Sequence, residues 1–182
     1  MVNGTVLERD GAAYRVLTAD GEVRAVLRGK VKRDTPHVVV GDRVRLDLEG
    51  EGGVMGIAGV EERTSLLARR VPEGRGNRPV VANVDQVLVV TASVDPAPIP
   101  QLIDRLLVVA EANELTAAVV INKTDLDPGT ALAARMELAG YRVFRTSARS
   151  GEGLADLRAA LAGRESVVTG PSGAGKSSLL NA

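Results

Sequence analysis

The chain has 182 residues, of which 45% are hydrophobic, and its 23 Lys and Arg residues balance its 23 Asp and Glu residues. This size and apolar content allow one or two packed domains, and zero net charge means that nucleic acid could be bound only through a local basic patch. The sequence has no cysteine and a single histidine, His37, which excludes disulfides, thiolate metal sites and multi-histidine sites. It contains no apolar run of 18 residues and no signal-peptide pattern, so we expect a cytoplasmic protein without a membrane span.

Residues 1–66 contain short β-branched runs separated by turn signals. Asp10-Gly11 and Asp20-Gly21 lie between alternating apolar and polar residues, which is the pattern of β-hairpins. The expected strands are 4–7, 14–17, 22–27, 41–46 and 54–60. Strands this short and this closely spaced predict an all-β domain, a small closed barrel of the OB type.

A basic run crosses one strand and one loop of this barrel. It consists of Arg24, Arg28, Lys30, Lys32 and Arg33. Charge runs are usually solvated surfaces, and residues 1–70 carry twelve Lys and Arg against eleven Asp and Glu. Because the barrel has only one aromatic residue, Tyr14, base stacking has little support. We therefore expect RNA to be contacted through its phosphates and shape, with strong salt dependence.

The segment after the barrel is polar and rich in breakers of regular structure. Residues 69–78 read Arg-Arg-Val-Pro-Glu-Gly-Arg-Gly-Asn-Arg, which indicates a linker or mobile loop. We expect the linker to span residues 67–82 and to add Arg69, Arg70, Arg75 and Arg78 to the basic surface.

From residue 83 to residue 182 the pattern changes to alternating strands and helices. Strands are expected near 86–91, 117–121, 141–145 and 166–169, and helices near 100–113, 129–139 and 152–162. Pro100 and Pro128 mark two of the helix starts. Such a run of βαβ units predicts an α/β domain with a mainly parallel sheet.

The segment Gly170-Pro171-Ser172-Gly173-Ala174-Gly175-Lys176-Ser177 fits the P-loop pattern G-x-x-x-x-G-K-S/T, and Ser178 extends the predicted phosphate site. It follows a β-branched run and precedes a helix-forming stretch, so its backbone N–H groups are expected to surround a phosphate. We expect Lys176 to reach the β- and γ-phosphates as the catalytic cation and Ser177 to ligate Mg²⁺. The pattern indicates a nucleotide but does not choose the base.

Asn122-Lys123-Thr124-Asp125 follows the apolar run 117–121 and fits the N-K-x-D box that recognises guanine. The Asp125 carboxylate can accept hydrogen bonds from guanine N1–H and the exocyclic amine, and adenine offers neither donor. Lys123 is expected to lie along the base, and Asn122 to brace the neighbouring loops.

A third motif supports the same base. Thr146-Ser147-Ala148 follows another expected strand and matches the short loop whose backbone N–H meets guanine O6, which adds Ser147 and Ala148 to the site. The N-K-x-D pattern alone is a weak signal. Three motifs at three strand ends predict a site for GTP or GDP.

The order of the motifs is unusual, because GTP-binding proteins ordinarily begin with the P-loop and here it comes last. This order indicates a circularly permuted P-loop GTPase domain. The switch segments and the D-x-x-G loop would then follow the P-loop, so we expect the domain to be incomplete at its C-terminus. We expect this chain to bind nucleotide without turning it over.

In its motif order and in residues 79–87, 122–126 and 170–178, the chain resembles the ribosome small-subunit-dependent GTPase A family. The resemblance covers the whole chain and implies an N-terminal OB barrel. It also implies late maturation of the small ribosomal subunit, contact with its rRNA, and GTP hydrolysis stimulated by that subunit. A zinc-binding domain follows the GTPase domain in the family, so zinc is expected only there. We expect a monomer.

Two hypotheses stay open. In the first, the intact protein is a GTPase and this chain holds its guanine and phosphate sites. In the second, the chain is a non-catalytic RNA-binding module with a nucleotide-sensing platform. A looser alternative is an adenine-nucleotide P-loop protein, which an Asp125→Asn substitution would reveal.

Overall fold

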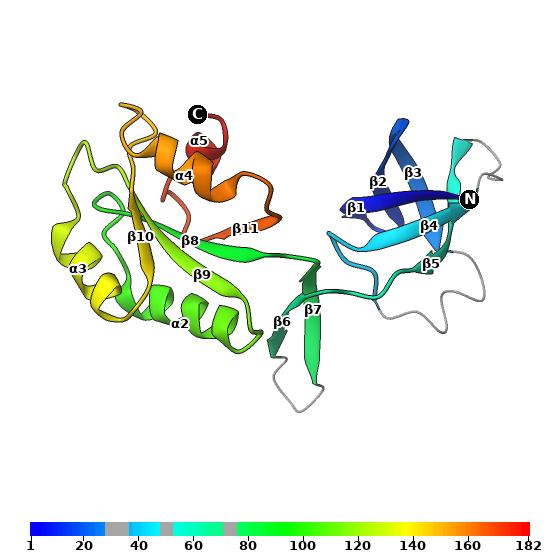
Figure 1. The fold of residues 1–182 in the computed structure, drawn as a ribbon, viewed down its shortest axis with the longest axis horizontal. Coiled ribbons are helices and arrows are strands. Elements are labelled where there is room, and N and C mark those ends of the chain that lie inside the picture. The colour runs from blue at the N-terminus through cyan, green and yellow to red at the C-terminus, as the bar shows by residue number, and fades with distance from the viewer. Residues whose placement is uncertain (28–36, 48–52, 71–75) are drawn as a thin grey trace. The chain divides into compact units, whose positions relative to one another are not determined.

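The computed structural model describes residues 1–27, 37–47, 53–70 and 76–182. The chain divides into two compact units, Met1–Asn83 and Val84–Ala182. Each unit has its own β-structure (Figure 1). Each also has its own buried hydrophobic cluster. The division lies one residue after the expected start of the α/β domain.

The first unit contains a closed barrel with the strand order β1-β2-β3-β5-β4. Its strands are β1 (Val2–Asp10), β2 (Ala13–Thr18), β3 (Gly21–Leu27), β4 (Arg43–Asp47) and β5 (Met55–Val60). Strand β3 pairs in parallel with β5, and the other pairings of the barrel are antiparallel. Apolar side chains alternate into the interior, where Val16, Val44 and Leu46 are fully buried. The expected barrel of the OB type is confirmed.

A two-stranded hairpin replaces the expected linker. Strand β6 (Leu66–Arg70) pairs antiparallel with β7 (Asn77–Ala82), and Leu67 lies opposite Val81. The prediction of a linker over residues 67–82 is therefore wrong for the described residues. Most of the breakers that suggested it lie between the two strands, while apolar residues at the base of the hairpin pair across the strands.

A buried ion pair joins the residue before β4 to the segment that leads from β5 into the hairpin. Arg63 donates to both carboxylate oxygens of Asp42, at 2.7 and 2.9 Å, and Asp42 is fully buried. Arg63 also donates to the His37 carbonyl at 2.8 Å. A charged hydrogen-bonded pair of this kind fixes the two segments it joins.

Asn83 makes a second connection at the base of the hairpin. Its amide donates to the Gly41 carbonyl at 2.8 Å, and its carbonyl accepts from the Thr64 N–H at 2.9 Å. The backbone N–H of Ala82 donates to the Val40 carbonyl at 2.9 Å. The hairpin is therefore an extension of the barrel unit.

The second unit is a parallel sheet with helices on both faces (Figure 1). Its strand order is β10 (Arg142–Arg145), β9 (Thr116–Asn122), β8 (Gln86–Ala92) and β11 (Ser166–Thr169), and neighbouring strands are parallel. Helices α2 (Pro100–Glu111) and α3 (Thr130–Leu138) lie on one side, and α4 (Leu154–Leu161) and α5 (Lys176–Leu180) on the other. All residues of β8 are buried because helices cover both of its faces. The predicted α/β domain is confirmed.

The strand order places a switch point beside β8. Strands β8, β9 and β10 follow one another toward one edge, whereas β11 pairs with the opposite side of β8. Open α/β sheets bind ligands at the carboxyl ends of their strands, where the order reverses. Four segments meet this end in spatial order: residues 146–148 after β10, the N-K-x-D box from the end of β9, residues 93–96 after β8, and the P-loop after β11.

Candidate functional site

The P-loop leads from β11 into α5 and packs closely on its neighbours. Gly170 and Gly175 have φ angles of 143° and 87°, which side-chain-bearing residues rarely adopt. A Cβ at Gly170 would overlap the carbonyl of Val90, and a Cβ at Gly175 would overlap the amide of Asn122. The turn thus needs glycine for close approach as well as for its dihedral angles.

Lys176 is held against this loop. Its Nζ donates to the carbonyl oxygens of Gly170 and Pro171, at 3.0 and 2.8 Å. Ser177 and Ser178 are exposed in the first turn of α5, whereas Ala174, within the loop, is fully buried. The ammonium is therefore pre-positioned at the loop that the sequence assigned to phosphate.

Asn122 connects three of the four strand-end segments. Its amide donates to the Ala174 carbonyl of the P-loop at 3.0 Å. Its carbonyl accepts from the Ala148 N–H at 3.2 Å and from the Thr146 hydroxyl at 3.5 Å. Only 2% of Asn122 is exposed, so these hydrogen bonds satisfy a buried polar group and fix the segments around it. The structure brings the three sequence motifs together through this side chain.

Asp125 is oriented by the 146–148 segment. The Ser147 hydroxyl donates to one Asp125 carboxylate oxygen at 2.7 Å and accepts from the Ser150 N–H at 3.0 Å. Beside this contact lies a pocket of about 420 Å³, lined by Asn122, Lys123, Asp125, Leu126, Ala148, Arg149, Gly175 and Ser178. The N-K-x-D box and the P-loop thus share one pocket.

Two residues of this pocket were not predicted from the sequence. Leu126 is 56% exposed, and Arg149 is exposed directly after Ser147 and Ala148. Their position next to the motifs is the only signal that could have identified them. Both can cover the faces of a flat ring, Leu126 by apolar contact and Arg149 by stacking of its guanidinium.

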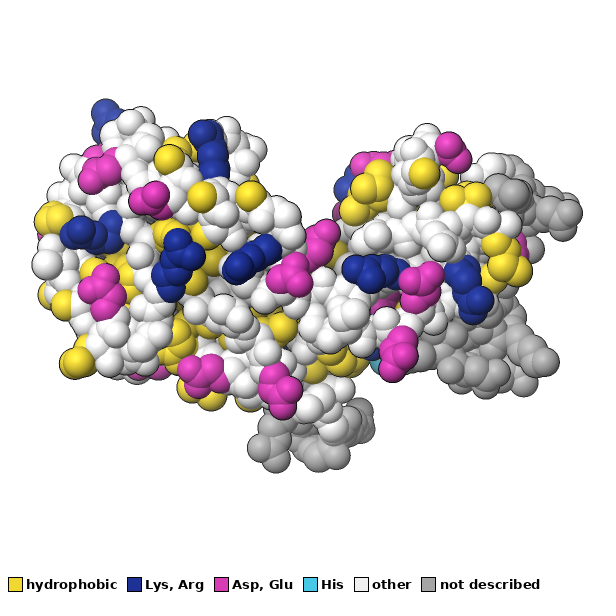
Figure 2. Space-filling model, in the orientation of Figure 1, with side chains coloured by type: hydrophobic (Ala, Val, Ile, Leu, Met, Phe, Trp, Pro, Cys, Tyr) yellow, Lys and Arg dark blue, Asp and Glu magenta, His cyan; other side chains and the backbone are white. Residues whose placement is uncertain are grey.

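Of the five residues predicted to bind RNA, the structure describes one. Arg24 is exposed on β3. Arg28, Lys30, Lys32 and Arg33 lie outside the described residues. Figure 2 shows Lys and Arg interspersed with Asp and Glu on the visible face, as expected for a chain of zero net charge.

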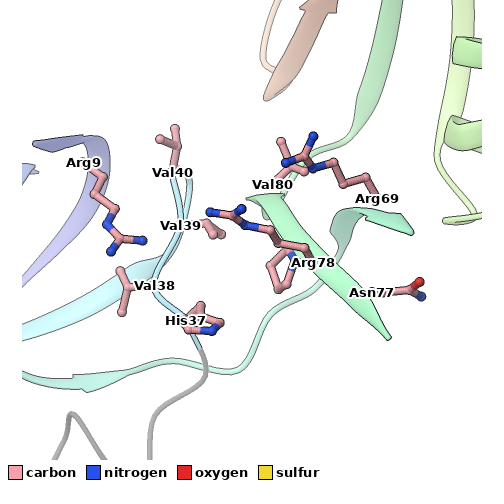
Figure 3. Close-up of a pocket in the computed structure, with 10 residues that line it drawn as sticks. Arg9, His37, Val38, Val39, Val40, Arg69, Asn77, Arg78 and Val80 are labelled. Atoms are coloured by element: carbon pink, nitrogen blue, oxygen red, sulfur yellow. The ribbon is translucent and has the colours of Figure 1, made fainter. Parts of the chain in front are cut away.

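A second pocket of about 770 Å³ lies in the first unit, between the barrel and the hairpin (Figure 3). We call it the arginine pocket; it is lined by Arg9, His37, Val38, Val39, Val40, Arg69, Asn77, Arg78, Pro79 and Val80. In Figure 3 the Arg78 side chain reaches from β7 toward Val39. Among the residues that the structure describes, the lining includes three arginines and no Asp or Glu, so the described part of this surface is cationic.

Two absences are established for the part of the chain that the structure describes. None of its helices is long and apolar enough to cross a membrane. It also contains no group of three or more His, Cys, Asp or Glu side chains placed to hold a metal ion.

Along the chain, the N-K-x-D box comes first, the 146–148 segment follows, and the P-loop comes last, and all three lie at the ends of parallel strands. This order defines the class of circularly permuted GTPase domains. The model of the RsgA GTPase family matches residues 60–182. The chain belongs to this family.

Two relatives are both named small ribosomal subunit biogenesis GTPase RsgA. The protein from Gemmatimonas aurantiaca is 46% identical, over 98% of this chain and 61% of its own length. The protein from Moorella thermoacetica is 39% identical, over 100% of this chain and 60% of its own length. The chain therefore spans about three fifths of these relatives.

Two solved structures have the same fold. YjeQ from Thermotoga maritima aligns with a TM-score of 0.76 and 36% identity, over 99% of this chain and 64% of its own. YloQ, described as a circularly permuted GTPase, aligns with a TM-score of 0.73 and 30% identity, over 100% of this chain and 64% of its own.

Proposed function

We propose that this chain carries the guanine-nucleotide site of a GTPase that acts in biogenesis of the small ribosomal subunit. The observation that carries the proposal is the bonding of Asn122 to the P-loop and to the 146–148 segment, which makes one site of three motifs. The names of the relatives support the biological role.

The base is recognised by the carboxylate of Asp125. Ser147 holds one of its oxygens at 2.7 Å, so the carboxylate is oriented before the nucleotide arrives. Guanine N1–H and its 2-amino group are the donors that suit such an acceptor. Asp125 is exposed, and an adenine bound against it would cover the carboxylate without offering it a donor. Lys123, Leu126 and Arg149 line the rest of the base pocket.

The phosphates are bound by Gly170 to Ser178. Gly170 and Gly175 allow this loop to pack on Val90 and Asn122, and the backbone N–H groups at the start of α5 suit a phosphate. Lys176 supplies the cation for the β- and γ-phosphates and thereby stabilises the charge that develops during hydrolysis. A serine hydroxyl together with phosphate oxygens and water forms the hard oxygen set that Mg²⁺ prefers, and Ser177 is the residue that would supply it. When bound, Mg²⁺ neutralises part of the phosphate charge.

The first unit supplies RNA contact through cations. Tyr14 is only 4% exposed, so it offers no ring for stacking of bases. Arg24 and the arginine pocket present guanidinium groups that suit phosphate oxygens, and the run Arg28 to Arg33 extends this proposal. A zinc domain elsewhere in the protein, a monomeric state and a cytoplasmic location are expectations of the same proposal.

An equilibrium titration of the 182-residue chain with GDP, GTP, ADP and ATP in Mg²⁺ tests the nucleotide site. We expect guanine-selective binding. Asp125→Asn should weaken GDP binding by about 100-fold and favour xanthosine diphosphate, because an amide can donate to the extra xanthine oxygen. The matched control is Asp127→Asn, because Asp127 contacts the Gly129 N–H at 2.8 Å and does not line the pocket.

Equal binding of adenine and guanine nucleotides would contradict the proposed base specificity. Hydrolysis belongs to the intact protein and is measured by adding small ribosomal subunits to it. Tight GTP binding without any stimulated hydrolysis would favour the non-catalytic module.

A further inference from the structure

The segment Ser93 to Pro96 lies at the centre of the site although it belongs to none of the motifs. It follows β8, which pairs with β9 on one side and with β11 on the other. The segment therefore follows the strand that lies between the strands leading to the N-K-x-D box and to the P-loop. It contacts both of them.

Ser93 holds the backbone of the N-K-x-D box at two consecutive carbonyl groups. Its N–H donates to the Asn122 carbonyl at 2.8 Å, and its hydroxyl donates to the Lys123 carbonyl at 2.9 Å. Ser93 is 7% exposed, so water competes little for these bonds.

The Lys123 carbonyl is also the acceptor that closes the turn carrying Asp125. It accepts from the Leu126 N–H at 3.0 Å in addition to the Ser93 hydroxyl. Lys123 itself has a φ of 64°, in the left-handed region that is unfavourable for a residue with a Cβ. Its backbone conformation therefore depends on contacts from neighbouring segments.

The same segment holds the other end of Lys123 and touches the P-loop. The Lys123 ammonium donates to the Asp95 carbonyl. A Cβ built at Gly173 would lie 3.2 Å from Pro96 Cδ, which places the proline ring against the P-loop. Lys123 is thus fixed at its carbonyl and at its ammonium by residues after β8.

We propose that Ser93 is a positioning residue for guanine recognition. By holding the Lys123 carbonyl it fixes the left-handed turn, and the turn directs Lys123 and Asp125 toward the base. The role acts through Lys123 and Asp125, since Ser93 does not line the base pocket. The inference rests on the proposed guanine-nucleotide site.

The test compares Ser93→Ala with a matched control, Thr91→Val, in the 182-residue chain. Thr91 is also a buried hydroxyl residue near the end of β8, and within the described residues its hydroxyl donates to the carbonyl of the adjacent Ala92, at 3.3 Å. The measurements are the dissociation constants for GDP and inosine diphosphate and the urea midpoint of the nucleotide-free chain. Inosine diphosphate lacks the 2-amino group, so the ratio of the two constants reports how well Asp125 is aimed.

We expect Ser93→Ala to weaken GDP binding by about five- to tenfold and to reduce the preference for GDP over inosine diphosphate. Thr91→Val should leave that preference unchanged, and Ser93→Thr, which restores a hydroxyl, should recover it at least in part. A loss of affinity that is equal for both nucleotides would overturn the positioning role and leave a purely structural one. Unchanged GDP binding in Ser93→Ala would overturn it as well. If the unsubstituted chain binds no guanine nucleotide, the proposed function and the role of Ser93 both fail.

Discussion

Gly170 and Gly163 are both glycines with a positive φ, but only Gly170 lacks room for a side chain. A Cβ at Gly163 meets no atom within 4 Å, whereas one at Gly170 would overlap the Val90 carbonyl. We expect Gly163→Ala to cost about 1 kcal/mol of unfolding free energy, from its dihedral alone. Gly170→Ala should cost more than about 4 kcal/mol, because the P-loop must move off β8. Urea denaturation of both variants checks this, and equal costs would exclude steric contact with β8 as the cause.

The Asn122 side chain bonds to both the P-loop and the 146–148 segment. Asn122→Ala leaves the buried Ala174 carbonyl and Ala148 N–H without their partner. We expect a loss of about 2–4 kcal/mol in unfolding free energy, since each buried unsatisfied group costs about 1–3 kcal/mol. Asn77→Ala, on the exposed hairpin strand, is the control and should stay within about 0.5 kcal/mol. A stable Asn122→Ala chain with normal GDP affinity would contradict the central place of this residue.

The Tyr141 hydroxyl donates to the Glu111 carboxylate at the end of α2, and this bond raises the pKa of Tyr141 to about 12, with a smaller contribution from burial. The folded pKa is above the unfolded value of 10.0, so the stabilisation is present below pH 10 and is lost as the pH rises to about 12. The stability difference between the unsubstituted chain and Tyr141→Phe should therefore shrink across that interval. We expect the stabilisation from this bond to be less than about 1 kcal/mol, because solvent screens an exposed pair. Denaturation at several pH values measures it, and a difference independent of pH would disprove the link.

At the scale of elements, the ion pair of Asp42 with Arg63 joins the start of β4 to the segment before the hairpin. Removing one partner of a buried pair typically costs about 3–5 kcal/mol, and Asp42→Ala removes the carboxylate that binds Arg63. We expect a loss of that size in the first unit, with unchanged GDP affinity in the second. Glu8→Ala breaks an exposed pair with Arg15 and should cost at most about 1 kcal/mol. Weaker GDP binding in Asp42→Ala would show that the two units do not behave independently.

The sequence predicted best those strands whose local composition is itself typical of a buried strand. The run 117–121 is apolar and the run 166–169 is mostly β-branched, and β9 and β11 match them within one residue. The hairpin was missed because breakers dominate residues 69–78, while the pairing of Leu67 with Val81 depends on distant residues.

In the candidate site, the P-loop and the N-K-x-D box could be located from the sequence because each is a run of consecutive residues of fixed pattern, and the structure joins the two runs. Ser93 could not be identified this way. It acts on the backbone carbonyl of Lys123, and a backbone acceptor leaves no trace in the sequence.

For the molecule as a whole, the proposal that cations of the first unit contact RNA phosphates predicts that binding to small ribosomal subunits depends strongly on salt. Neutralising Arg9 and Arg78 to Gln should lower the salt slope of subunit binding by about one per arginine and leave GDP affinity unchanged. Arg15→Gln is the control, because Arg15 already pairs with Glu8 and Glu22. Binding insensitive to salt, or unaffected by loss of the Arg24 to Arg33 run and of the pocket arginines, would refute the RNA surface.

The pairing of β11 with β8 sets the order in which the domain can be completed during synthesis. Ser166 of β11 lies opposite Gln86 of β8, so β8 leaves the ribosome about 80 residues before β11. At about 5–20 residues per second this is a delay of about 4–16 s. The N-K-x-D box, at the end of β9, emerges well within that interval. Because closing a distant pair is slow, docking of β11 is expected to be the late step of folding. A nascent chain would thus carry its N-K-x-D box for seconds before β11 and the P-loop emerged.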